Sequence, residues 1–313
     1  MKTIAIITPV FNEELSIKCF YENLVNVINA NNLQAYKFSL LFSNNRSSDK
    51  TLEIIEVLHR TSKAIPVEFI TLSRNFGYQG SLTASLSVSS ADAYIIIDVD
   101  MEDPLYMIPK FIEKWESGYD FVYGIRDKRP ENFIVQGMRK FFYRFTSLIA
   151  DVDFIIDVAE FSLISNRFKN EALKTRSTFP FLRSDFAYIG FNRIGIKYSR
   201  EVRRFGETHY NFFGMAKFAI AGILSSSTFP LRMLSYIGVP LAFLELVFFF
   251  VFLFTQNSFY LSINQIIFFF YIFISIPSIS IYIARIYKDG IRKPTYIIDY
   301  QKSSIKIPES ASD

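Results

Sequence analysis

The stretch YIIIDVDMEDP, residues 94–104, runs from an apolar segment directly into four carboxylates. Its first half is typical of a buried strand. Its second half holds Asp98, Asp100, Glu102 and Asp103, which repel one another unless they are solvated, paired or bound to a metal. We therefore expect a cation at the end of this strand.

The segments around this stretch, over residues 1–200, alternate between two periodicities. Short apolar runs rich in β-forming residues alternate with stretches of helical period. The expected strands are TIAIITPV (3–10), KFSLLFS (37–43), PVEFITLS (66–73), AYIIIDVD (93–100) and DFVYGIR (120–126), and the clearest helices are 14–30 and 51–60. This alternation predicts an α/β fold of βαβ units with a mostly parallel sheet.

Polar residues follow the first four of these strands. They are Asn12–Glu14, NNRSSD (44–49), SRNFG (73–77) and DVDMED (98–103). Ligands bind at the carboxyl ends of the strands in such sheets. We therefore expect the four loops to meet at one edge of the sheet and to form the site.

Composition limits the possible functions. Of 313 residues, 50% are apolar and 17% aromatic, which is high for a soluble protein, and the net charge of +4 is far from that of a nucleic-acid binder. Cys19 is the only cysteine, and no Cys/His set has zinc-site spacing, which favours a reducing compartment and a metal with oxygen ligands. The N-terminal MKTIAIITPVFNEE has too short an apolar run for a signal peptide and reads as the first strand.

The excess of apolar residues lies near the C-terminus. Segments 233–256 and 262–284 are each apolar over about 20 residues, which predicts two membrane-spanning helices rather than buried core helices. Arg232 precedes the first span and basic residues follow the second, whereas the link between the spans has no Lys or Arg. The positive-inside rule then predicts a multi-pass protein of the cytoplasmic (inner) membrane, with the catalytic domain on the cytoplasmic side.

The segment before the first span, 211–232, is less apolar and includes Lys217, Pro230 and Arg232. This composition suits helices that lie along the lipid headgroups. Four regions are therefore expected: an α/β domain at 1–210, interfacial amphipathic helices at 211–232, two transmembrane helices at 233–287 and a cytoplasmic tail at 288–313.

Eight motifs occur in order along nearly the whole chain: ITPVFNEE, NNRSSDKT, LSRNFG, DVDMEDP, GYDFVYGIR, AEFSLIS, FPLR and IYKDGIRKPTYII. Together they resemble family 2 glycosyltransferases of the polyprenyl-phosphate type, the relatives of dolichol-phosphate mannose synthase and bacterial bactoprenol glucosyltransferases. The resemblance implies a Rossmann-like GT-A fold, a nucleotide-sugar donor, Mg²⁺ or Mn²⁺, and inverting transfer of a sugar to a polyprenyl (undecaprenyl-type) phosphate. It also implies a homotetramer.

Asp98 and Asp100 are the expected metal ligands, and Asp100 is also an expected catalytic residue. Two positions apart on an extended segment, they project from one face and can reach one ion or one ribose together. A divalent ion would neutralise charge on the departing diphosphate; the alternative is two solvated aspartates in a turn. Glu102 stands where the resembled family usually has glutamine, so its charge either strengthens metal binding or alters the acceptor pocket.

Basic residues that would bind phosphate are also implied by the resemblance. Arg126, in YGIR, matches an arginine near the donor or acceptor phosphate, and Arg203 or Arg204 matches a basic loop ahead of the membrane region. Guanidinium groups bind phosphate oxygens bidentately, whereas an isolated surface arginine does little. His209 stands where the family carries lysine. A neutral imidazole has less charge than a lysine, so His209 either binds the donor phosphate or has no role in binding it.

Glu160, in DVAEFSLIS, matches a family aspartate proposed as catalytic base or acceptor-site carboxylate. A lipid monophosphate with a second pKa of about 6 is already largely anionic at neutral pH and scarcely needs a base. This weakens the base role but leaves it open: Glu160 is an expected catalytic residue that acts as the base or orients the acceptor or a basic residue, and a structural ion pair is the alternative. Ser162 replaces a common family arginine, which leaves the contacts to the acceptor phosphate open.

The resemblance places Pro9, Val10, Phe11 and Glu13 around the base and ribose of the donor. Where the family offers an aspartate pair to the base, this chain has Asn44 and Asn45, whose amides both donate and accept hydrogen bonds. The bacterial relatives favour uridine as the base.

SRNFG is expected to place Arg74 and Asn75 near the donor, and a plain strand-to-helix turn is the alternative. Two other functions compete with transfer to a polyprenyl phosphate. One is a membrane-anchored glycosyltransferase that acts on a saccharide or a lipid-linked oligosaccharide, and the other is a non-enzymatic membrane scaffold.

Overall fold

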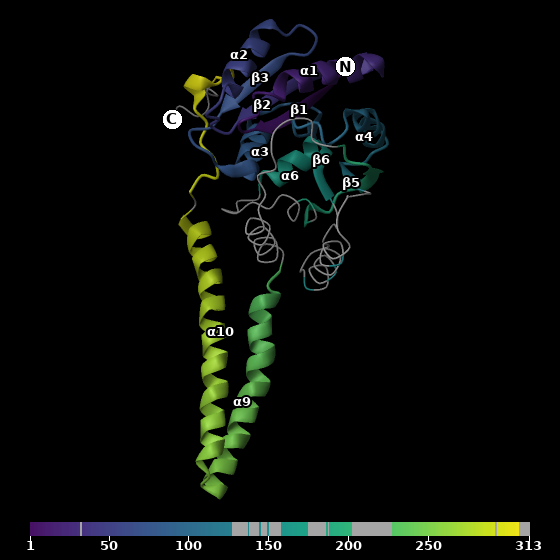
Figure 1. The fold of residues 1–313 in the computed structure, drawn as a ribbon. Helices are drawn as coiled ribbons and strands as arrows, with labels where there is room; N and C mark the ends of the chain where they lie inside the picture. The colour runs from purple at the N-terminus through teal and green to yellow at the C-terminus, as the bar shows by residue number, and fades with distance from the viewer. Residues whose placement is uncertain are drawn as a thin grey trace.

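A computed structural model describes residues 1–31, 33–126, 158–174, 188–201, 227–291 and 293–306, together with the single positions 137, 144, 149 and 186. An α/β domain lies at one end, and a pair of long helices projects from it (Figure 1). The domain is built on a seven-stranded sheet with the strand order β3-β2-β1-β4-β6-β5-β7.

The sheet is mostly parallel. Its strands are β1 Lys2–Val10, β2 Tyr36–Asn44, β3 Val67–Thr71, β4 Ala93–Ile96, β5 Phe121–Arg126, β6 Val158–Ser165 and β7 Arg193–Tyr198. Strands β3, β2, β1 and β4 are parallel, β6 is antiparallel to its neighbours β4 and β5, and β7 is parallel to β5. The α/β class and the five predicted strands are confirmed, whereas β6 and β7 were not expected from the sequence.

Helices cover both faces of this sheet. They are α1 Ile17–Ala30, α2 Thr51–Thr61, α3 Gly77–Val88, α4 Ile108–Glu116 and α6 Asn166–Ala172, with 3₁₀ turns at Leu33–Ala35, Leu105–Met107 and Tyr300–Lys302. Alternate residues of β1 point to opposite faces: Ile4 and Ile6 pack with α1 and α4, whereas Ala5 and Ile7 pack with α3 and α6. A strand buried on both faces reads as a continuous apolar run, as the β1 sequence does.

Two long helices follow the domain, α9 Phe229–Thr255 and α10 Ser258–Ile291. Both are long and apolar enough to cross a membrane. They pack against each other, and the Tyr271 hydroxyl of α10 donates to the Leu234 carbonyl of α9 at 3.0 Å. Apart from Gln256, which caps the end of α9, the predicted spans lie within these helices. The link between them is shorter than expected, because the Asn257 side chain accepts the Phe259 N–H and α10 begins at Ser258. Of the expected interfacial segment, 211–226 lie outside the described residues and 229–232 form the start of α9.

The chain after α10 returns to the domain and runs antiparallel along β3. The Ser73 N–H donates to the Ile297 carbonyl and the Asp299 N–H to the Thr71 carbonyl, at 2.9 and 2.8 Å. Further on, the Ser304 side chain accepts the Phe69 N–H at 2.7 Å. This segment therefore meets β3 first at its carboxyl end, a few residues after α10, and the carboxyl edge of the sheet is the edge nearer the two long helices.

Candidate active site

Three of the four predicted loops are joined at the carboxyl edge of the sheet. The Asn12 side chain accepts the Ser48 N–H at 2.8 Å, which connects the loop after β1 to the loop after β2. The Asn45 side chain donates to the Asn75 side chain and accepts the Phe76 N–H, both at 2.9 Å, which connects the second loop to the third. The predicted convergence of these loops is confirmed.

The backbone in these loops turns sharply. Asn12, Arg46 and Met101 all have φ between 56° and 63°, in the left-handed region, and each follows a different strand. Such conformations cost free energy in residues other than glycine and cluster at functional sites. At Met101, the turn brings the Glu102 N–H to the Asp100 carboxylate at 3.0 Å.

Asp98 and Asp100 follow β4, and neither forms an ion pair with a cationic side chain among the described residues. Burial raises the pKa of Asp98 to about 8, with further contributions from the charges of Asp100, Asp103 and Glu160. The Tyr78 hydroxyl is buried nearby without a hydrogen bond of ordinary geometry among the described residues, and burial together with the Asp98 charge raises its pKa. Burial and the neighbouring carboxylates thus disfavour the charged form of Asp98, and a bound cation would relieve this.

Asp98 and Asp100 fit a divalent ion whose remaining ligands come from the substrate and from water. Among the described residues, no group of three or more His, Cys, Asp or Glu side chains could enclose a metal. Mg²⁺ in phosphoryl-containing sites is bound by one or two carboxylates plus substrate phosphates and water. Asp98 and Asp100 can supply those two carboxylate ligands.

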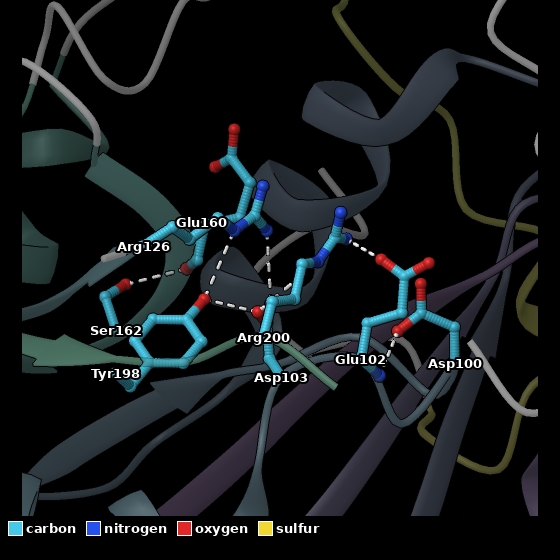
Figure 2. A network of polar contacts seen from close by, with 8 residues as sticks. All are labelled: Asp100, Glu102, Asp103, Arg126, Glu160, Ser162, Tyr198 and Arg200. Atoms are coloured by element: carbon cyan, nitrogen blue, oxygen red, sulfur yellow. Dashed lines mark hydrogen bonds and ion pairs between the residues drawn. The ribbon is translucent and has the colours of Figure 1, made fainter. Parts of the chain in front are cut away.

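Asp103, three residues after Asp100, is in a different environment. Its side chain is only 1% exposed, and it accepts hydrogen bonds from the Tyr198 hydroxyl and from Arg126 Nη2, the latter at 3.3 Å (Figure 2). Arg126 Nε also donates to the Tyr198 hydroxyl at 3.2 Å. Burial lowers the pKa of Arg126, but the charge of Asp103 and the contact with Tyr198 outweigh it and raise the pKa overall. Burial and Asp103 also raise the pKa of Tyr198.

Arg200 joins the same network from the segment after β7. Its guanidinium forms an ion pair with Glu102, and its Nε lies 3.9 Å from the Asp103 carboxylate (Figure 2). The Glu201 N–H donates to the Glu102 carbonyl at 2.9 Å. The segment 198–201 is thus held to the loop 102–103 by both side chains and backbone.

The residues expected around the base differ in exposure. Pro9 and Val10 are buried at the end of β1, whereas Phe11 is 44% exposed. The Glu13 carboxylate accepts from the Ser16 hydroxyl at 2.8 Å, close to the start of α1. Phe11 is therefore the one of these side chains most open to a ligand.

Asn44 is buried, and its side chain accepts the Ser47 N–H at 3.0 Å, so it shapes the loop after β2. Asn75 accepts the Gly77 N–H at 2.8 Å and likewise shapes its own loop. Arg74 is exposed, with its guanidinium 4.1 Å from the centre of the Phe76 ring. Arg74 is thus presented at the surface of the site.

Glu160 lies in β6 near Asp98, on the far side of the site from Glu102 (Figure 2). Ser162 is buried, and its hydroxyl donates to the Glu160 carbonyl at 3.0 Å, so its hydrogen bond lies within β6. Arg203, Arg204 and His209 lie outside the described residues.

Sequence reasoning missed three residues of this site, Tyr78, Tyr198 and Arg200, and it named Asp103 without assigning it a partner. The partners of Asp103 could not be recognised from the acidic stretch itself, because Arg126 and Tyr198 are 23 and 95 residues away in sequence. An expectation of β7 would have placed Tyr198 and Arg200 at the same edge of the sheet.

A mostly parallel α/β sheet, an aspartate pair after its central strand β4 and two long apolar helices beyond the domain agree with the GT-A class of glycosyltransferases. The model of "Glycosyl transferase family 2" matches residues 5–190, and the chain belongs to this family. It is therefore a transferase.

Relatives of known name span most of the chain. "Uncharacterized glycosyltransferase YkcC" of Bacillus subtilis (strain 168) is 34% identical over 309 residues, which cover 96% of this chain and 93% of the relative. "Prophage bactoprenol glucosyl transferase homolog" of Escherichia coli (strain K12) is 33% identical over 241 residues, which cover 76% and 77%. Among solved structures, glucosyl-3-phosphoglycerate synthase from Mycobacterium tuberculosis, in complex with Mn²⁺ and UDP, has 16% sequence identity and a TM-score of 0.48, and the match covers 72% of this chain and 79% of that one.

Proposed function

We propose that this glycosyltransferase transfers a sugar from a nucleotide-sugar, expected to be UDP-linked, to a polyprenyl phosphate, with inversion and with a divalent cation. The observation that carries the proposal is where the site lies. Asp98 and Asp100 follow β4 at the carboxyl edge of the sheet, and the chain that returns from two helices of membrane length pairs with β3 starting at that same edge. Relatives named bactoprenol glucosyl transferase support a lipid acceptor.

The donor side of the reaction uses the carboxylates after β4. Asp98 and Asp100 would hold Mg²⁺ or Mn²⁺ together with the donor diphosphate, and the ion supplies positive charge where the departing phosphate becomes negative. Arg74, exposed at the same edge, can contribute a guanidinium to the diphosphate. The loops after β1 and β2 would bind the base and ribose, with Phe11 as the exposed apolar surface.

The acceptor side needs little base catalysis. A polyprenyl phosphate with a second pKa of about 6 is mostly dianionic at neutral pH. One of its oxygens forms a bond to the anomeric carbon while the bond from that carbon to the donor phosphate breaks, and the nucleoside diphosphate leaves. Glu160 would orient the acceptor rather than deprotonate it.

Arginine would bind the acceptor phosphate. Arg126 uses Nε and Nη2 in the network with Asp103 and Tyr198, and its Nη1 has no partner among the described residues. This nitrogen can donate to a phosphate oxygen while the rest of the group stays fixed. Arg203, Arg204 and His209 are proposed for the same phosphates from the sequence alone.

The two long helices would place this chemistry beside a lipid headgroup. We propose that they cross the inner membrane as a hairpin, with the domain and the returning tail in the cytoplasm. Attachment of the returning tail to β3 would keep the carboxyl edge facing the bilayer. The homotetramer and the four-region division stay predictions.

The test is a transfer assay with purified full-length protein in nanodiscs. Labelled UDP-, GDP- and dTDP-sugars are each offered with undecaprenyl phosphate, a soluble saccharide or a lipid-linked oligosaccharide, with and without EDTA. We expect label in extractable lipid, with undecaprenyl phosphate as acceptor and only when metal is present. Transfer to either of the other acceptors alone would replace this proposal with a saccharide-directed enzyme, and no turnover of any donor would favour a scaffold.

A further inference from the structure

We propose that Tyr78 is a positioning residue for the cation used in sugar transfer: its buried hydroxyl donates a hydrogen bond to Asp98 when Asp98 binds the divalent ion, and so fixes the orientation of that carboxylate. The inference rests on the proposed function, because it concerns the cation expected at Asp98 and Asp100. Tyr78 lies in the first turn of α3, which begins at the last residue of the loop SRNFG.

The first support is the face of the sheet from which Asp98 projects. Ile96, the last residue of β4, packs in the cluster under α3, and the Tyr78 ring packs against the same cluster. Ile97 and Val99 are buried in the cluster on the opposite face, so the alternation of side chains continues past the end of β4. Asp98 therefore projects towards α3, on the side of the sheet where Tyr78 lies.

Glu160 lies on the same face. Ala159 and Phe161, its neighbours in β6, are buried in the cluster on the opposite face, so the Glu160 side chain also projects towards α3. Burial, then the charges of Asp98 and Glu160, raise the pKa of Tyr78, which places its hydroxyl beside both carboxylates. Of the two charges, that of Asp98 has the larger effect, which favours Asp98 as the partner of the hydroxyl.

The second support is the hydroxyl itself. Its oxygen is buried, and it forms no hydrogen bond of ordinary geometry within the part of the chain that the structure describes. A buried tyrosine hydroxyl usually has a partner, because leaving it without one costs free energy. An ionised Asp98 held in place by a cation would supply the acceptor that this hydroxyl lacks.

The third support is the chemistry of carboxylates that bind metal ions. Such carboxylates are themselves commonly held by hydrogen bonds from neighbouring groups, and these partners orient the ligand. A hydroxyl that donates to a carboxylate also stabilises its negative charge. Orientation and charge thus act in the same direction, and both strengthen cation binding. Tyr78 acts through Asp98 and does not itself need to touch the ion or the donor.

Removal of the hydroxyl tests this inference on full-length protein in detergent. The probe is Mn²⁺ alone, titrated by the spin resonance signal of the free ion, and the melting temperature is measured separately with EDTA. We expect Tyr78→Phe to weaken Mn²⁺ binding about tenfold, because the metal-binding carboxylate loses the group that orients it. The melting temperature of the metal-free protein should stay the same or rise, because the buried hydroxyl has no partner among the described residues to lose.

The matched control is Tyr94→Phe. Tyr94 is a fully buried tyrosine on the same face of the sheet, and its hydroxyl accepts the Ala91 N–H at 2.8 Å and donates to the Asn166 side chain at 3.2 Å. Its loss should lower the melting temperature and leave Mn²⁺ affinity within about twofold of the wild type. Tyr78→Leu also lacks the hydroxyl and should show the same loss of affinity as Tyr78→Phe, which provides a second variant if Tyr78→Phe does not fold.

Glu160→Gln shows which carboxylate accepts from the hydroxyl. If Tyr78 acts through Asp98, adding Tyr78→Phe to Glu160→Gln should weaken Mn²⁺ binding by the same factor as in the wild type, to within about twofold. An effect of Tyr78→Phe that disappears in the Glu160→Gln background would mean that the hydroxyl acts through Glu160, and would overturn the inference.

Three further outcomes contradict the inference: unchanged Mn²⁺ affinity in both Tyr78 variants, a melting temperature lowered by Tyr78→Phe as much as by Tyr94→Phe, and no Mn²⁺ binding by the wild type. Mn²⁺ binding requires neither sugar nor lipid, so the inference and the proposed function can fail separately. A protein that shows the expected loss of affinity but transfers no sugar to undecaprenyl phosphate would overturn the proposed function and leave the role of Tyr78 at the cation intact.

Discussion

The acidic stretch contains two pairs of carboxylates with opposite surroundings. Asp98 and Asp100 have no cationic partner among the described residues, and burial together with neighbouring charge raises the pKa of Asp98 to about 8. Glu102 and Asp103, the next two, are paired with Arg200 and Arg126. Within six residues of sequence, the first two carboxylates therefore have no cationic partner among the described residues, whereas each of the next two forms an ion pair with an arginine.

This difference separates a binding group from its support. A buried carboxylate without a partner costs stability, and it persists where a ligand supplies the missing charge. A buried carboxylate with several donors holds its loop rigidly, provided every partner stays in place. We infer that the second pair fixes the position of the first, and the substitutions below would separate activity from stability accordingly.

The largest expected effect is on catalysis. Asp100→Ala should lower transfer to undecaprenyl phosphate by about two to three orders of magnitude, because the charge that holds the cation at the diphosphate is lost. The insertion of the helices should stay unchanged and the melting temperature should fall only slightly, since the side chain has no ion pair among the described residues and accepts one backbone hydrogen bond, from the Glu102 N–H. Turnover and differential scanning fluorimetry on the same preparation check both. Near-normal turnover would remove the metal from the proposed mechanism.

The next effect is on stability. Asp103→Asn should lower the free energy of unfolding by about 3 kcal/mol, because Arg126 and Tyr198 lose a buried anionic acceptor. Chemical denaturation followed by tryptophan fluorescence measures the change. The control is Glu116→Gln, which breaks the pair with Lys2, whose side chain is 54% exposed, and should cost less than about 1 kcal/mol. Equal losses in the two variants would contradict a special role for Asp103.

Asp98→Asn should act in the opposite direction. In metal-free protein at pH 7, the substitution removes a carboxyl group whose ionisation is opposed by burial and by Asp100, Asp103 and Glu160. We expect the unfolding free energy to rise by about 1 kcal/mol while transfer falls as steeply as in Asp100→Ala. Denaturation with EDTA present is the measurement. A loss of stability there would mean that Asp98, like Asp103, is a structural carboxylate.

The sequence predicts the role of Asp98 and Asp100 but misses the ion pairs of Glu102 and Asp103, and the reasons are physical. The strands before the polar loops read clearly, since β1, β2 and β4 are buried on both faces and appear as apolar runs. Helix α3 is not among the clearest helices in the sequence, because GYQGSLTASLSV consists mostly of small residues and is buried around much of its circumference, which removes the amphipathic period. Strand β7 was missed because it is a half-buried edge strand.

The aspartates that need a partner could therefore be found from local sequence, whereas the residues that neutralise their neighbours could not. Asp98 and Asp100 are conspicuous because they follow an apolar run, two positions apart. The partners of Asp103 come from the end of β5 and from the missed strand β7. Pairing between distant segments depends on strand order, and no local pattern of residues reports the antiparallel β6 inserted between β4 and β5.

The smallest effect tests whether the paired carboxylates form a network or a set of separate contacts. Tyr198→Phe removes a hydroxyl that donates to Asp103 and accepts from Arg126, and leaves the Arg126–Asp103 ion pair in place. We expect a loss of about 1 kcal/mol in unfolding free energy and less than a threefold change in turnover, since the ring still packs against Phe161. Combining it with Asp103→Asn should cost clearly less than the sum of the single changes, because both act on one hydrogen bond. Strict additivity would show that Tyr198 and Asp103 are energetically independent, and the second pair of carboxylates would then support the first through its arginines alone.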